Sequence, residues 1–369
     1  MTSPSFLPVA VAGHICLDII PSFRGGAVRL EDVLVPGKLV NVGGAVIATG
    51  GAVSNTGQAL HRLGVPVRLI GKVGDDPFGQ IVVERLRQQC PELGDAMTVS
   101  PGEPTSYTVV VSPPGVDRLF LHCPGTNDTF GPDDVDDSFV GDGLFHFGYP
   151  PLMRRMYERE GAALTDLLRG AQKRGAITSL DMALPDPESD AGRADWPTIL
   201  ANALPHVDVF LPSLDETLYM LGPETAAPAN LAQTCREVAG RLLDLGVPIV
   251  VLKLGEDGLY LRSAKGPRLD AICERTGANS ADWRDREEYA PCFAANVVGT
   301  NGAGDATIAG FLAALTNGCL PRECCRFATA VGACSVEALD SYSGVRTWEE
   351  TMTRLEDGWP QCPAHGDFR

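Results

Sequence analysis

The residues best suited to do chemistry lie in one short stretch, 299–311, which reads GTNGAGDATIAGF. Its apolar positions recur at helical spacing, so a helix is predicted to begin there. Three small residues, Gly302, Ala303 and Gly304, fall at the helix start, where free N–H groups favour an anion. Asp305 adds a carboxylate beside this anion site. A carboxylate next to bound phosphate is unfavourable unless it takes a proton from an attacking hydroxyl, so the stretch indicates phosphoryl transfer to an alcohol.

Simpler interpretations of this stretch remain open. A glycine-rich turn before a helix is common, and an Asp in the first turn can serve only to stabilise the helix dipole. Two better-known phosphate-binding patterns are excluded. No Gly-Lys-Ser/Thr follows, as a P-loop requires. The glycine spacing and the location near the C-terminal end also differ from the dinucleotide-binding fingerprint.

The stretch closely resembles the C-terminal signature of the ribokinase-like (PfkB-type) sugar kinases, Asp-Thr-x-Gly-Ala-Gly-Asp. The resemblance implies that the main-chain amides of the three small residues form an anion hole and that Asp305 is the catalytic base. It also predicts that Thr300 and Asn301 bind the nucleotide. The first Asp of the signature is Gly299 here, at a position that often helps to bind a monovalent cation. The use of such a cation is therefore left undecided.

Two motifs near the N-terminus predict the sugar site. Gly13 to Asp18 reads GHICLD, and it resembles a family pattern whose final Asp binds sugar hydroxyls. The pair Gly50 and Gly51, followed by Asn55, resembles the Gly-Gly-x-x-x-Asn signature, in which all three residues contact the sugar. The residues alone also allow Asp18 to begin a turn and Asn55 to cap a helix.

A third pair of residues is predicted to organise Mg²⁺. Ser213 to Glu216 occupies the position of the family motif Asn-x-x-Glu, whose Glu holds Mg²⁺ through water. Ser213 replaces the Asn, and a helix capping box would explain the same spacing. Asp181, at the end of a predicted strand, is the second candidate metal residue.

The segment that begins at Lys253 reads KLGEDG and resembles a family turn that borders the nucleotide. Gly255 and Gly258 are predicted to lie against ATP, and Lys253 either reaches a phosphate or pairs with a carboxylate. Arg154 and Arg155 could bind a phosphate on the substrate. Because they lie in a predicted helix, the sequence favours the alternative that both arginines lie on its solvent-exposed face.

The chain as a whole alternates between predicted strands and helices, which favours a parallel sheet with helices on both faces. Together with the motifs, this predicts a single α/β domain, 1–369, with the ribokinase-like three-layer sandwich. Residues 8–20 are expected to form the first strand. A small β-sheet lid is expected from about 21–48 and 104–123, and an insertion loop from about 266–291.

Composition narrows the possible partners. The net charge is −17, with 47 acidic and 30 basic residues, and such a surface repels nucleic acid and anionic lipid. No apolar run reaches the roughly 18 residues that a membrane span needs, and the N-terminus lacks the basic region of a signal peptide. The 11 scattered cysteines fit neither a disulfide framework nor zinc spacing. We therefore expect a cytoplasmic protein.

These observations predict a kinase that uses ATP and Mg²⁺ to phosphorylate a hydroxyl, expected to be primary, on a small sugar or sugar acid. A nucleoside kinase of the same fold is the first alternative. A sugar-binding regulator that has lost catalysis, and a kinase acting on a phosphosugar, are the others. The family lid often pairs two copies, so a homodimer through the lid is also possible.

Overall fold

The computed structural model describes residues 4–23, 30–114, 119–136, 141, 143–222, 230–364 and 368. Within them, the largest sheet has eight strands in the order β14-β13-β12-β11-β10-β9-β1-β4. Its strands are β1 (Val9–Gly13), β4 (Val67–Ile70), β9 (Leu144–Gly148), β10 (Ile177–Leu180), β11 (Val209–Phe210), β12 (Ile249–Lys253), β13 (Leu259–Ser263) and β14 (Glu287–Ala290). Neighbours from β12 to β4 are parallel, whereas β13 pairs antiparallel with β12 and β14. The predicted mostly parallel sheet is confirmed.

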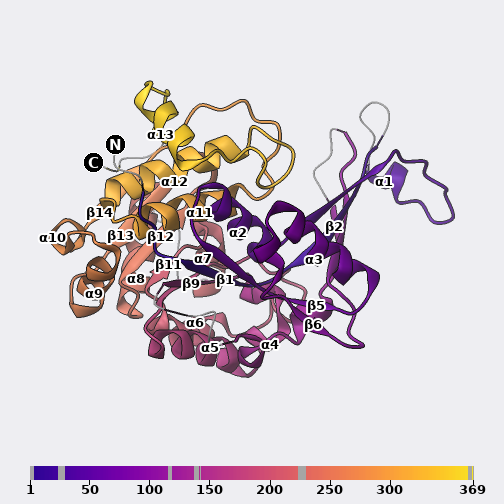
Figure 1. Ribbon diagram of the computed structural model, residues 1–369, viewed down its shortest axis with the longest axis horizontal. Helices are drawn as coiled ribbons and strands as arrows, with labels where there is room; N and C mark the ends of the chain where they lie inside the picture. The colour runs from indigo at the N-terminus through magenta and orange to yellow at the C-terminus, as the bar shows by residue number, and fades with distance from the viewer. Residues whose placement is uncertain are drawn as a thin grey trace.

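Helices cover both faces of this sheet, as the layers in Figure 1 show. Because side chains alternate along a strand, Val9 and Val11 face one helix layer while Ala10 and Ala12 face the other. The first layer contains α2 (Ala52–Arg62), α3 (Pro77–Gln89), α9 (Pro267–Thr276), α11 (Ala303–Thr316), α12 (Pro321–Ser335) and α13 (Trp348–Glu356). The second contains α4 (Arg154–Tyr157), α5 (Ala162–Lys173), α6 (Trp196–Ala203), α7 (Leu214–Leu221) and α8 (Leu231–Asp244).

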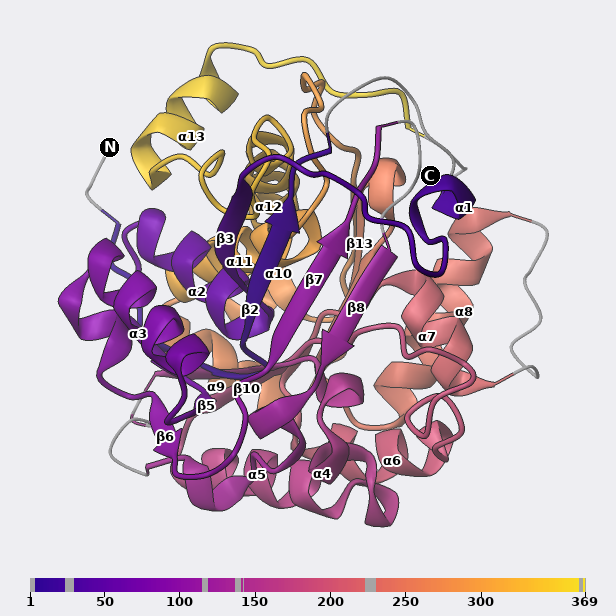
Figure 2. The ribbon, with the colours of Figure 1, turned by 90° about the vertical axis from the view of Figure 1, so that its right-hand side faces the viewer.

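A second sheet, which we call the lid sheet, has four strands in the order β3-β2-β7-β8. They are β2 (Cys16–Pro21), β3 (Ala45–Gly50), β7 (Tyr107–Val111) and β8 (Leu119–Cys123). Figure 1 shows this sheet projecting from the side of the main body, and Figure 2 shows its strands side by side. The short helix α1 (Leu30–Val33) follows β2, and β5 (Lys72–Gly74) pairs with β6 (Thr98–Ser100) in a separate two-stranded sheet.

The single first strand expected at 8–20 is wrong, because the chain divides there into β1 and β2, which belong to different sheets. Gly13 lies at the break with φ 126°, and a Cβ on it would lie 2.4 Å from the carbonyl oxygen of Gly148. Asn127 secures the next step by accepting from the N–H of Ile15 at 3.2 Å and donating to its carbonyl at 2.9 Å. The apolar sequence continues across this break without interruption. For that reason the sequence alone predicted one strand instead of two.

The insertion expected as a loop at 266–291 is also different, since it folds as α9, α10 (Ser280–Trp283) and β14. Leu269, Ile272 and Cys273 have helical spacing and are buried, and the side chain of Trp283 is fully buried. The many charged residues between them obscured this apolar face. The segment extends the main sheet by its edge strand and covers one face of it.

Among the residues that the structure describes, no helix is both long enough and apolar enough to cross a membrane.

Candidate active site

Functional candidates gather at one edge of the main sheet, where five neighbouring parallel strands end. His14 follows β1, Tyr149 follows β9, and Asp181 follows β10. Ser213 lies three residues beyond β11, and Lys253 is the last residue of β12. The carboxyl ends of parallel strands are the usual place for ligands in such sheets. The fold therefore brings together residues that are more than 200 positions apart in the chain.

Helix α11 begins where the sequence predicted, with Gly302 as its N-cap at φ 71°. This left-handed backbone favours glycine, and a Cβ there would lie only 2.3 Å from the Cβ of Ser341. The first intrahelical bond runs from the Ala306 N–H to the Gly302 carbonyl at 2.9 Å. The amides of Gly304 and Asp305 precede that bond, so they are placed as anion donors. The Ala303 amide already makes a long turn bond to Thr300 at 3.4 Å.

Asp305 lies in the first turn of α11, and only 3% of its surface is exposed. Its Oδ2 accepts from Asn55 Nδ2 at 3.0 Å and from the Tyr149 hydroxyl at 2.7 Å. Its Oδ1 accepts from the Thr56 hydroxyl at 3.1 Å. Ser341 orients the Asn55 amide by donating to its Oδ1 at 2.7 Å. We call Asp305, Asn55, Thr56 and Tyr149 the base end of the site.

Burial raises the pKa of Asp305, while the hydroxyl of Tyr149 and the amide of Asn55 oppose the rise. Removal from water disfavours the carboxylate, and the donors stabilise it. A raised pKa makes the carboxylate a stronger proton acceptor near neutral pH. The group thus has the environment expected of a general base.

Asp181 and Lys253 form a buried ion pair with Nζ and Oδ1 2.5 Å apart. Burial raises the pKa of Asp181, the Lys253 cation opposes this rise, and the negative charges of Glu216 and Asp305 add to it. Lys253 keeps a raised pKa, because Asp181 and the other carboxylates outweigh the effect of burial. Its Cε would lie 3.8 Å from a Cβ on Gly304, so the cation is beside the start of α11. Of the two roles that the sequence left open for Lys253, the structure shows the pairing with a carboxylate.

Glu216 closes a capping box, since its Oε2 accepts from the Ser213 N–H at 2.6 Å and its own N–H donates to Ser213 Oγ at 3.2 Å. No group of three His, Cys, Asp or Glu side chains close enough to hold a metal directly occurs in the described ranges. Burial is the main cause of the raised pKa of Asp181, and the negative charges of Glu216 and Asp305 add to it. A hydrated Mg²⁺ fits such a field, because it keeps several waters and takes few protein ligands.

The turn after β12 is a tight glycine turn. Gly255 and Gly258 have φ 61° and 101°, and the Leu254 N–H donates to the Gly258 carbonyl at 2.9 Å. A Cβ on Gly258 would lie 2.2 Å from the Ala290 carbonyl oxygen. Thr300 and Asn301 lead directly into α11. These four residues remain predictions as nucleotide contacts.

The other end of the site, which we call the acceptor end, comprises Asp18, His14 and His122. Burial raises the pKa of Asp18 to about 6. The two motif glycines have an unforeseen effect here. A Cβ on Gly50 would lie 2.3 Å from Asp18 Oδ2, and one on Gly51 would lie 2.5 Å from His14 Nδ1. The glycine pair therefore makes room for the two side chains.

Comparison with known proteins shows the family of this chain. The family model described as "pfkB family carbohydrate kinase" matches residues 26–348. The chain belongs to this family of carbohydrate kinases.

The kinase is 29% identical over 285 residues to an uncharacterized sugar kinase of Archaeoglobus fulgidus, covering 77% of this chain and 96% of that protein. It is 28% identical over 276 residues to the 2-dehydro-3-deoxygluconokinase of Thermoproteus tenax, covering 73% and 74%.

Solved structures share the ribokinase-like fold. Arabidopsis thaliana ribokinase, solved with ribose and ATP, has a TM-score of 0.73 at 19% identity, with 95% of the kinase and 99% of that chain covered. A putative ribokinase II from E. coli, solved with ATP and Mg²⁺, has a TM-score of 0.69 at 21% identity, with 95% and 99% covered. Proteins of this fold thus bind ATP and Mg²⁺.

The sequence analysis missed two residues of the base end, Thr56 and Tyr149, and also Ser341, which orients Asn55. Thr56 lies next to the predicted Asn55, but nothing in its type marked it. Tyr149 follows a predicted strand end and has φ 66°, which is uncommon outside glycine. Ser341 lies 286 residues from Asn55, so only the fold reveals their bond. The position of Tyr149 after a buried strand was the one available signal.

Gly299, where the family signature has Asp, is closely packed. A Cβ on this residue would lie 2.9 Å from the Ala338 carbonyl oxygen and 3.2 Å from that of Leu339. The N–H of Gly299 donates to the Val336 carbonyl at 3.2 Å. An Asp would require this C-terminal turn to move, which explains the glycine physically.

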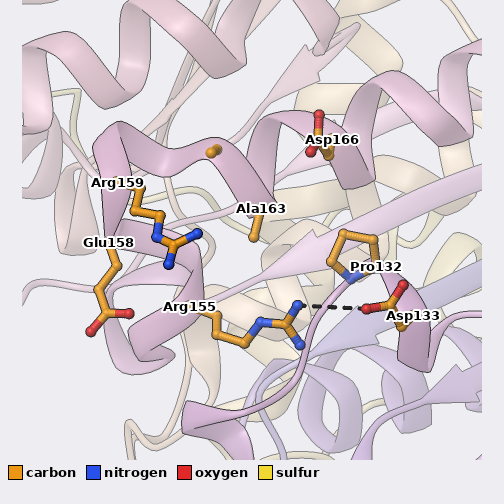
Figure 3. A pocket seen from close by; sticks show the side chains of 8 residues that line it. Pro132, Asp133, Arg155, Glu158, Arg159, Ala163 and Asp166 are labelled. Carbon is orange, nitrogen blue, oxygen red and sulfur yellow. Dashed lines mark ion pairs between the residues drawn. The ribbon is translucent and has the colours of Figure 1, made fainter.

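The paired arginines do not belong to the base end. Arg154 forms an exposed ion pair with Glu158 at 3.8 Å. Arg155 donates to the Thr129 carbonyl at 3.0 Å and lies 3.7 Å from Asp133. Figure 3 shows Arg155 and Arg159 beside a surface cavity of about 520 Å³ that Glu158, Asp133 and Asp166 also line. The solvated-face interpretation fits these contacts. Arg118, another arginine that the phosphosugar alternative could use, lies outside the described residues.

Proposed function

We propose that this kinase transfers the γ-phosphoryl group of ATP to a hydroxyl, preferably a primary one, of a small sugar or sugar acid. The observation that carries the proposal is the buried Asp305 carboxylate at the amide-bearing start of α11. Base and anion site are adjacent there, which in-line phosphoryl transfer to an alcohol requires.

Asp305 Oδ1 is the proposed proton acceptor. Oδ2 already accepts two hydrogen bonds, from Asn55 and Tyr149, whereas Oδ1 accepts one, from Thr56. A carboxylate oxygen has room for about two such bonds. The acceptor hydroxyl therefore donates to Oδ1 and gives up its proton as its oxygen bonds to phosphorus.

The start of α11 stabilises the charge on the moving phosphoryl group in this proposal. The amides of Gly302, Ala303 and Gly304 would form the anion hole, with those of Gly304 and Asp305 free of the first intrahelical bond, and Lys253 adds a cation beside Gly304. Mg²⁺, when bound, neutralises the charge on the ATP phosphates. Glu216 would hold it through water, and Asp181 would set the position of Lys253. Asp18, Gly50, Gly51 and Asn55 form the sugar side, and the lid sheet excludes water.

The decisive experiment is an ADP-release assay with purified protein, ATP and Mg²⁺ over a panel of pentoses, hexoses, sugar acids and nucleosides. Sugar-dependent ADP formation that Asp305→Asn abolishes supports the proposal. Turnover of nucleosides alone would make the chain a nucleoside kinase. Sugar binding without ADP formation, unchanged in Asp305→Asn, would make it a regulator.

The lid sheet carries exposed apolar side chains, with Val46 57%, Phe120 52% and Leu121 52% exposed. We propose that two copies pair through this sheet. Light scattering of the purified protein tests the dimer, and Phe120→Glu should shift it to monomer. A wild-type monomer would remove this part of the proposal.

A further inference from the structure

His14 is a buried polar side chain without a partner. Only 2% of its surface is exposed, and neither ring nitrogen has a hydrogen-bond partner among the residues that the structure describes. Buried polar atoms are normally paired, so each exception calls for an explanation. Leaving them unpaired costs free energy unless a ligand satisfies them.

The location of His14 connects it to both ends of the site. It lies between β1 and β2, at the point where the chain passes from the main sheet to the lid sheet. Its ring centroid is 6.1 Å from that of Tyr149, which binds the base, and 5.3 Å from that of His122 on the lid sheet. The ring therefore bridges the base end and the acceptor end.

The surroundings of His14 are built to hold the ring in place. The Val53 N–H donates to the His14 carbonyl at 3.1 Å, which fixes its backbone against the start of α2. The missing Cβ of Gly51 leaves the space that Nδ1 needs. Across the lid sheet, Asp18 pairs with Thr108 and Thr108 with His122 in direct register. The side chains of Asp18, Thr108 and His122 consequently lie on one face of the lid sheet.

We propose that His14 is a specificity residue that hydrogen-bonds an uncharged oxygen of the phosphoryl acceptor, either a hydroxyl or a carbonyl. The inference rests on the proposed kinase function and extends it to this side chain. The three residues Asp18, His14 and Tyr149 would then contact different parts of one small polyol.

The charges around His14 indicate why this oxygen is uncharged. Burial, followed by the neighbouring His122, lowers the pKa of His14 to about 3, so the imidazole stays neutral. A neutral imidazole offers one donor and one acceptor, which suits a hydroxyl or a carbonyl. Asp18 and Asp305 would repel an anionic group, and Lys253 is held by Asp181.

A second buried histidine provides a comparison within the same sheet. His146 on β9 is fully buried, but its Nδ1 has a partner in Ser179 Oγ at 2.9 Å. Only one of the two ring nitrogens of His146, Nε2, lacks a partner among the described residues, whereas both ring nitrogens of His14 lack one. Among the described residues His146 thus has one partner, and His14 has none.

The test compares wild type, His14→Phe and His14→Asn in the ADP-release assay. The acceptors are the best sugar from the panel and its deoxy analogues, each lacking one hydroxyl or the carbonyl oxygen. Phe keeps a ring without nitrogens, and Asn keeps a donor and an acceptor if Phe fails to fold. His206→Phe is the matched control, since His206 contacts Gln172 at 3.0 Å before β11, at the opposite end of the strands.

We expect His14→Phe to raise the acceptor KM at least about tenfold and to leave the KM for ATP and the melting temperature nearly unchanged. We also expect wild type to discriminate against one deoxy analogue by about tenfold or more, and His14→Phe to use that analogue and the parent sugar equally. His14→Asn should restore part of the discrimination. A merely structural histidine would instead lower stability and alter both KM values.

Three results would overturn the inference. The first is sugar-dependent turnover with an acceptor KM that is unchanged in both variants. The second is equal discrimination against every deoxy analogue in wild type and His14→Phe. The third is that the group sensed through His14 proves to be the carboxylate of a sugar acid or the phosphate of a phosphosugar. If wild type itself forms no ADP with any acceptor, the proposed function fails first, and this inference falls with it.

Discussion

The base end and the acceptor end differ in how fully the protein satisfies their polar groups. At the base end, Asp305 receives three hydrogen bonds, and Ser341 fixes the amide that makes one of them. At the acceptor end, His14 receives none from the described residues, although Asp18 accepts from the Cys16 thiol at 3.3 Å and from Thr108, and His122 Nδ1 contacts the Thr108 hydroxyl at 3.0 Å. Asp305 and His14 are both buried, at 3% and 2% exposed, so the difference between these two groups does not come from exposure to water.

This difference separates positioning from recognition. A base must already be oriented when the hydroxyl arrives, so its hydrogen bonds come from the protein. A recognition group gains most when the substrate supplies the missing bond, because an analogue that lacks the matching group leaves it unpaired. Substitutions at the base end should consequently lower kcat, and those at the acceptor end should raise the KM for sugar.

The largest expected effect is at Asp305. Asp305→Asn removes the proton acceptor at nearly constant volume and should lower kcat by about 10³-fold with little change in the KM for ATP. Steady-state ADP release measures it. Asp244→Asn, exposed near the end of α8, is the control and should retain full activity. A loss below tenfold would show that another group takes the proton.

A smaller but still large effect is expected at Gly50. Gly50→Ala would place a Cβ 2.3 Å from Asp18 Oδ2, so the carboxylate must move. We expect the acceptor KM to rise by about 10²-fold while the KM for ATP stays near its wild-type value. Gly44→Ala, on the same segment with nothing within 4 Å of the added carbon, is the matched control. Similar KM values in both variants would contradict the assignment of Asp18 to the sugar.

Tyr149→Phe should lower kcat by about tenfold, since it removes one of the three donors that orient Asp305. That donor also holds the pKa of Asp305 down against burial. Without it the pKa rises further, and the acidic limb of the pH–kcat profile should move to higher pH. A limb that stays in place, or moves to lower pH, would show that Tyr149 does not act on the base.

The smallest effect is expected from pH at the acceptor end. Asp18 has a pKa of about 6, so in the free enzyme it becomes protonated as the pH falls through this value. A protonated carboxyl accepts hydrogen bonds poorly, so the acceptor KM should rise severalfold below pH 6. Asp18→Asn should have a higher KM that no longer depends on pH in this range. If the acceptor KM of the wild type does not change with pH in this range, Asp18 does not bind the sugar.

The sequence predicted the base end better than its surroundings. Asp305 and Asn55 could be named because each lies in a short motif whose local geometry is self-contained. Tyr149 and Ser341 could not, since their bonds depend on how the end of β9 is placed against α11 and how the turn after α12 is placed against α2. Helix α9 was missed because its charged residues outnumber the apolar ones that pack inward. His14 was passed over because a histidine in an apolar strand signals nothing until its lack of partners is known.

The division of the first strand also has a mechanical consequence. Residues 14 and 15 are the short link between the main sheet and the first strand of the lid sheet, and the Asn127 amide binds both backbone groups of Ile15. One buried amide thus fixes the backbone at the point where the lid strand begins. Because His14 is the other residue of this link, its position is tied through two peptide units to β2, the strand that carries Asp18.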